Sequence, residues 1–123
     1  MSKALKTTFG VHALISLILG LPLLLAPGRF LGLFGWFPID PLITRLFGAA
    51  LLAFAWGSFQ GYKKSESDLH TTLIQFELIF TTAGMVGLLR HLLVAWYPWY
   101  VWVIFFILTI FAALWLFFLL KRR

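Results

Sequence analysis

The sequence PWYVWVIFFILTIFAALWLFFLL occupies residues 98–120, and the basic residues KRR follow at 121–123. The run carries no charge, and it is as long as the roughly 20 apolar residues that a helix needs to cross the hydrocarbon core of a bilayer. Of the 123 residues in the chain, 62% are hydrophobic and 11% are charged, against about half and about a quarter in soluble domains. The sequence therefore predicts a helical membrane protein and excludes a water-soluble globule.

Three further apolar segments precede this run and complete a set of four predicted spans. Four spans take about 80 residues and leave about 40 for loops and tails, so no soluble domain fits. Asp40 followed by Pro41 is typical of a helix start, because an acidic N-cap and a proline at the first helical position both favour one. We thus expect an all-α membrane protein, a single four-helix transmembrane bundle over residues 1–123, with spans at 7–26, 41–62, 69–95 and 98–120.

The segment between the first two spans, residues 27–40, is too short to cross a bilayer and is rich in glycine and aromatic residues. It is predicted to form an interfacial loop or a short surface helix, with a re-entrant loop as the alternative. Gly20, Pro22 and Pro27 are expected to kink or fray the end of the first span, because proline and glycine weaken helices.

Basic residues divide unequally between the two sides of the predicted membrane. With four spans, both termini and the loop 61–68 share one side, which holds seven of the ten Lys and Arg residues. The positive-inside bias therefore predicts cytoplasmic N- and C-termini in the cell (cytoplasmic) membrane. Aromatic residues typical of the headgroup region gather at the opposite ends of the spans: Trp36, Phe37, Trp96, Tyr97, Trp99, Tyr100 and Trp102. The excess positive charge, which extends to Arg123, is thus a topology signal, and no nucleic-acid partner is expected.

Few ionisable residues lie inside the predicted spans, and each is a candidate site because an isolated charge in hydrocarbon costs several kcal/mol. Counted at helical rise, His12 lies about 8 Å and Glu77 about 12 Å from the cytoplasmic ends of the first and third spans. We therefore expect His12 and Glu77 to pair in the cytoplasmic half of the bundle, as a binding or proton-relay site. Ser16, Thr81 and Gln60 are expected around this pair.

A structural role for the same residues is the alternative. A protonated Glu77 that hydrogen-bonds to a neighbouring helix would fix helix register, and His12 would be a satisfied buried residue or would reach the interface. No histidine pair lies four residues apart, and no carboxylate cluster accompanies either residue, so neither a metal site nor a cofactor is expected. The chain has no cysteine, which excludes disulfides and thiolate metal sites.

A stripe of small residues marks the second span, where Ala49, Ala53, Gly57 and Gly61 recur every four residues. Small side chains at this spacing allow another helix to approach closely, so the stripe predicts a helix-packing face. The pattern fits a partner helix in the same chain or in a second copy of it.

Three segments of the first half of the chain carry a resemblance to known proteins. They read LLAPGRF at 24–30, DP at 40–41 and RLFGAALLAFAWG at 45–57. In these segments the chain resembles small four-helix integral membrane proteins of bacteria and archaea, broadly DoxX-like. The resemblance implies a four-helix bundle in a prokaryotic cytoplasmic membrane. It does not reach the third and fourth spans, so it assigns no role to Glu77.

Three functions remain open from the sequence. Walker A, GxSxG and HExxH motifs are all absent, so we expect no enzymatic activity and no catalytic residues. The first interpretation is an accessory or oligomerising subunit whose partners are the lipid bilayer and a homo-oligomer or larger membrane complex. The alternative is a small proton-coupled transporter or channel that uses His12 and Glu77. The aromatic residues at the outer span ends raise lipid or quinone binding as a third interpretation.

Overall fold

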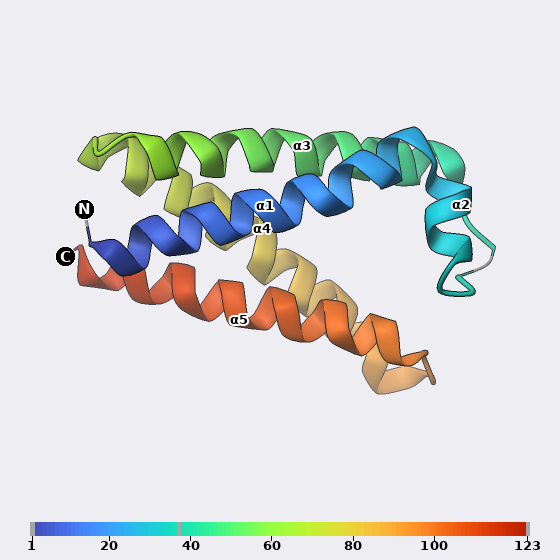
Figure 1. Cartoon of the computed structure of the whole chain (residues 1–123). Helices are drawn as coiled ribbons and strands as arrows, with labels where there is room; N and C mark the ends of the chain where they lie inside the picture. Colours follow the sequence, from blue (N-terminus) through green and yellow to red (C-terminus); the bar gives the residue numbers. More distant parts are fainter. Residues whose placement is uncertain (1, 37, 123) are drawn as a thin grey trace. The chain divides into compact units, whose positions relative to one another are not determined.

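The structure is a computed structural model, shown in Figure 1, and it describes residues 2–36 and 38–122. Helices make up 86% of it, and no strand occurs among the described residues. The all-α prediction is therefore confirmed, while two residues named above, Phe37 and Arg123, lie outside the described ranges. The helices are α1 (Lys3–Leu25), α2 (Pro27–Gly32), α3 (Pro41–Lys63), α4 (Ser67–Val94) and α5 (Trp99–Lys121).

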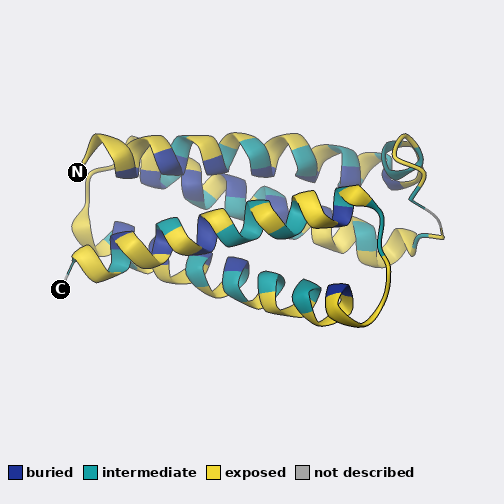
Figure 2. Cartoon of the chain, turned by 90° about the horizontal axis from the view of Figure 1, so that it is seen from below, coloured by how far each residue is buried: buried dark blue, intermediate teal, exposed yellow. Residues whose placement is uncertain are grey.

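Four of the helices, α1, α3, α4 and α5, are long and apolar enough to cross a membrane. They coincide with the four predicted spans, and the largest difference is at the start of α1, which begins at Lys3 rather than at residue 7. Exposed positions, yellow in Figure 2, run along these helices and include large apolar residues such as Leu14, Ile79 and Phe106. Lipid chains accept such surfaces, so the four helices indicate a multi-pass membrane protein.

Helix α3 starts where the sequence predicts. The Asp40 carboxylate oxygen Oδ1 accepts hydrogen bonds from the backbone N–H groups of Leu42 and Ile43, at 3.0 and 3.2 Å. Pro41 opens the helix, where its missing N–H costs nothing. One turn further on, the Arg45 guanidinium donates to the backbone carbonyl of Leu24 at 2.7 Å. A cation thus meets the carboxyl end of α1, where the helix dipole favours positive charge.

The end of α1 differs in detail from the expectation. Pro22 lies inside the helix, which continues to Leu25 and stops at Ala26, with φ −146° and ψ 64°. A residue that precedes proline is disfavoured in the helical region, so Pro27 accounts for the break at Ala26. Pro27 then begins α2. Residues 27–40 therefore contain a short helix, which is one of the structures that the sequence analysis predicts for this segment.

The chain divides into two compact units, residues 1–65 and 66–123. Unit 1 contains α1, α2 and α3, and unit 2 contains α4 and α5. Each unit is described here by itself, and the single four-helix domain over residues 1–123 stays a prediction. In unit 1, α1 and α3 lie side by side in opposite directions, and α2 follows at the end where α1 stops (Figure 1).

Helices α1 and α3 approach each other closely at two places. A Cβ on Gly48 would lie 2.6 Å from the backbone nitrogen of Leu24 and 2.9 Å from the backbone oxygen of Gly20. Nearer the other end, a Cβ on Gly61 would lie 2.8 Å from the ring of Phe9. The backbone of α3 therefore contacts the backbone of α1 at Gly48 and an aromatic ring of α1 at Gly61. Small residues permit such close contacts between membrane helices.

Unit 2 is an antiparallel pair formed by α4 and α5. Leu108 packs against Gly84, where an added Cβ would lie 3.1 Å from the leucine Cδ1. At the end of α5, the Arg122 guanidinium donates to the Ser67 carbonyl at 3.3 Å and to the Thr71 hydroxyl at 3.2 Å. These bonds join the last turn of α5 to the first turn of α4.

Candidate functional site

The first candidate site lies in unit 1, where His12 contacts Ser58. The Nδ1 atom of His12 is 2.9 Å from the Ser58 hydroxyl oxygen, a hydrogen-bonding distance that links α1 to α3. Both side chains are buried, with His12 5% exposed and Ser58 fully covered. Either ring nitrogen of a neutral histidine is able to carry the proton, so each partner is a capable donor or acceptor.

The polar face of α1 extends on both sides of His12. Thr8 and Ser16 lie four residues before and after it, and both are buried. The Thr8 hydroxyl donates a hydrogen bond to the backbone carbonyl of Ala4 at 2.8 Å, so its hydrogen-bond partner lies in the same helix. Gln60, which the sequence groups with this site, is half-buried on α3. His12 and Ser16 thus share one buried face of α1.

The second candidate site lies in unit 2, along one face of α4. His70, Glu77 and Thr81 are each 1% exposed. Their spacing places them on one side of the helix, because residues seven and four positions apart share a face. The Thr81 hydroxyl donates to the backbone carbonyl of Glu77 at 2.8 Å. Thr81 is therefore bonded to the backbone of Glu77, and its place around a pair of His12 and Glu77 stays a prediction.

The predicted pairing of His12 with Glu77 joins a residue of unit 1 to a residue of unit 2. Within its own unit, His12 is held by Ser58. Within its own unit, Glu77 shares a buried face with Thr81. The contact between His12 and Glu77 stays a prediction.

Sequence reasoning missed Ser58. The four-residue stripe drew attention to a different face of α3, although a serine inside an apolar span is itself a signal. The face of α3 that is buried comprises Gly48, Leu51, Ala55, Ser58 and Gly61. Spacings of three and four residues, rather than strictly four, follow one face of a helix and would have included Ser58.

The small-residue stripe itself is divided by the structure. Gly61 lies against Phe9 of α1, and Gly57 is half-buried. Ala49 and Ala53 are exposed. The contact between α1 and α3 therefore includes one end of the stripe and leaves the two alanines at its other end uncovered.

The described residues hold no cluster of three or more His, Asp or Glu side chains that would bind a metal ion. No protein-family model matches the chain, and neither a curated protein nor a solved structure matches it. The chemistry of the two polar sites therefore rests on their own geometry.

Proposed function

We propose that this chain is an integral membrane protein without enzymatic activity that works by association, as an accessory or oligomerising subunit. One observation carries the proposal: Ala49 and Ala53 of α3 are exposed. Elsewhere α3 exposes large side chains to its surroundings, among them Leu42, Leu46 and Trp56. A patch of alanines between such residues is suited to a close-approaching helix, since small residues at helix–helix contacts let backbones pack tightly.

The setting that we propose for this subunit is a prokaryotic cytoplasmic membrane, with both termini in the cytoplasm. It is supported by the seven basic residues on one side of the predicted spans and by the resemblance to DoxX-like proteins over residues 24–57. The partner on the alanine patch is a second copy of this chain or a subunit of a larger membrane complex.

Cysteine cross-linking in membranes tests the association, because the chain has no cysteine of its own. Ala53→Cys is expected to form a disulfide-linked dimer, or an adduct with a cysteine-bearing partner, under mild oxidation. Ile43→Cys is the matched control, since Ile43 is exposed on the same helix and lies about 80° or more around the helix axis from the two alanines, at 100° per residue. Association is ruled out if two results are found together. Ala49→Cys and Ala53→Cys both stay monomeric, and the wild type purifies in mild detergent as a monomer without any co-purifying protein.

A second function, proton-coupled transport, is favoured by the depth of the ionisable residues. Glu77 on α4 is 1% exposed, and the buried His12 on α1 lies at hydrogen-bonding distance from Ser58 of α3. Ionisable groups held away from water are typical of proton pathways in membrane proteins. In this case the chain would work as a small transporter or channel that moves a proton through His12 and Glu77.

Proton flux into proteoliposomes that contain a pH-sensitive dye tests this second function. Glu77→Gln is expected to abolish flux while helicity is retained, because the amide keeps the shape of the carboxyl group and loses its proton. Glu66→Gln, at the exposed start of α4, is the control and should leave flux unchanged. Unchanged flux in Glu77→Gln would remove this residue from the mechanism.

A further inference from the structure

An apolar groove of about 620 Å³ lies between α1 and α3 of unit 1. Its floor includes the small residues Gly10 and Ala13, and its walls include Trp56, Phe59 and Tyr62. Small residues of α1 and aromatic residues of α3 both line the groove. Tyr62 lies directly over Gly10, where an added Cβ would be 3.1 Å from the ring.

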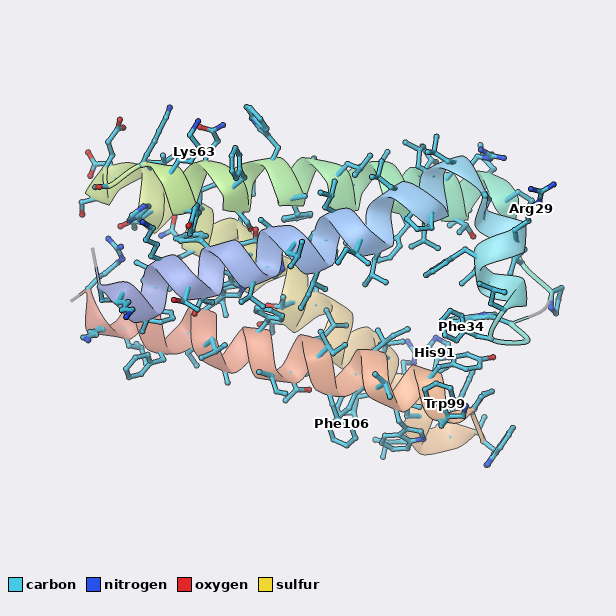
Figure 3. The ribbon with its side chains drawn as sticks, viewed as in Figure 1. Arg29, Phe34, Lys63, His91, Trp99 and Phe106 are labelled. Atoms are coloured by element: carbon cyan, nitrogen blue, oxygen red, sulfur yellow. The ribbon has the colours of Figure 1, made fainter. Side chains whose placement is uncertain are left out.

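One end of the groove carries two cations, one from each helix. The ammonium of Lys6 lies 4.9 Å from the centre of the Tyr62 ring, and that of Lys63 lies 5.3 Å from the centre of the Phe59 ring. Figure 3 shows Lys63 at the end of α3. Each ammonium thus lies above an aromatic wall of the groove, at a distance typical of cation–π contacts.

No acidic side chain of unit 1 lies near these two lysines to neutralise their charge. Asp40 is the one acidic residue among residues 1–65, and it caps the start of α3, at the opposite end from Lys63. The groove therefore combines an apolar channel with two lysines at its mouth, and the next acidic residues in the sequence are Glu66 and Asp68. A ligand that complements it has an anionic head and an apolar tail.

The length of the groove also fits a lipid. From Lys6 to Leu17, which lines the far end, α1 rises about 16 Å at 1.5 Å per residue. Half of a hydrocarbon core that is about 30 Å thick is about 15 Å. The groove therefore matches the length of one acyl chain of a single leaflet whose headgroup is at the level of the lysines.

We propose that this groove binds an anionic phospholipid, with its phosphate between Lys6 and Lys63 and one acyl chain against Ala13 and Trp56. Trp56 is 65% exposed, so an acyl chain has direct access to this wall. Lys and Arg side chains near the surface of anionic membranes each contribute about a factor of five to binding. Ala49 and Ala53 do not line the groove, so variants of the two lysines and of Ala13 leave the alanine patch intact, although Trp56 borders both surfaces.

Native mass spectrometry of the full chain tests the proposal, using micelles that contain equal amounts of phosphatidylglycerol and phosphatidylcholine. The wild type should retain phosphatidylglycerol preferentially. The double variant Lys6→Gln/Lys63→Gln should weaken that retention about 30-fold, because two cations are lost, and Lys6→Arg/Lys63→Arg should restore it. The matched control Lys3→Gln/Lys64→Gln removes the same charge from exposed lysines of unit 1 and should retain the lipid.

The acyl chain is tested by Ala13→Phe, which fills the floor of the groove and keeps both lysines. It should lower phosphatidylglycerol retention at least tenfold, with helicity measured by circular dichroism to show that the variant is folded. Equal retention of the two lipids by the wild type would overturn the proposal, as would equal losses in the two double glutamine variants or full retention by folded Ala13→Phe. Dimerisation through Ala13→Cys would assign the groove to a second copy instead. Cross-linking at Ala53 reports on the proposed function separately.

Discussion

Replacing Ser58 with alanine removes the hydroxyl that lies 2.9 Å from His12 Nδ1. A hydrogen bond between membrane helices contributes about 0.6 kcal/mol on average and up to about 1.7. We expect Ser58→Ala to lower the free energy of unfolding by about 1 kcal/mol, measured by titration with a denaturing detergent and followed by circular dichroism. Ser65→Ala, in the exposed loop after α3, is the control, and an equal loss in both variants would contradict a specific bond.

Some residues of the candidate sites could be predicted from the sequence, and others could not. His12, Glu77 and Thr81 were selected because polar groups are rare in apolar spans, and all three are buried. The partner Ser58 was not selected, because it lies outside the four-residue stripe of small residues on which the interpretation of α3 was based. The depth of a residue in the membrane follows from counting along its helix. The residue that faces it on the next helix depends on how the two helices are rotated about their axes, and hydropathy does not encode that rotation.

At the scale of the elements, the crossing of α1 and α3 depends on Gly48. Gly48→Ala would place a Cβ 2.6 Å from the Leu24 nitrogen, and backbone atoms have no rotamer by which to move away. The helices must separate, so we expect a loss of about 1–3 kcal/mol in the free energy of unfolding, the range for overpacked sites.

The matched control for this prediction is Gly87→Ala on α4, where an added Cβ meets no atom within 4 Å. Alanine is the better helix former by up to about 1 kcal/mol, so Gly87→Ala should keep or raise stability in the same detergent titration. A neutral effect of Gly48→Ala would show that α1 and α3 are not held as closely as this crossing requires.

The helix bounds were the most predictable part of the fold. Long apolar runs with few charges define the spans, and Asp40–Pro41 defines the start of α3, because these signals are local in the chain. The groove and the Arg45 bond to the Leu24 carbonyl were not predictable, since each joins residues from two helices. Such contacts arise from the small residues Gly10 and Gly48, whose importance appears only when the facing helix is known.

At the scale of the whole molecule, the close contacts described above are completed inside unit 1 or inside unit 2. We therefore expect residues 1–65 to insert and fold as a fragment, and Gly48→Ala to destabilise the fragment and the full chain by equal amounts. Detergent titration of both forms, followed by circular dichroism, provides the comparison. A fragment that is unstructured in micelles or vesicles would show that unit 1 depends on the rest of the chain.

The division into two hairpins has a consequence for how the protein is made. Ribosomes add about 5–20 residues per second, so the partner of α1 follows it out of the tunnel within seconds. The long helix α1 meets its antiparallel neighbour α3 as the next long helix synthesised, and α5 likewise follows α4. Biogenesis can then proceed as two successive insertions, and the glycine-lined crossing of the first hairpin can close while the second is still being translated.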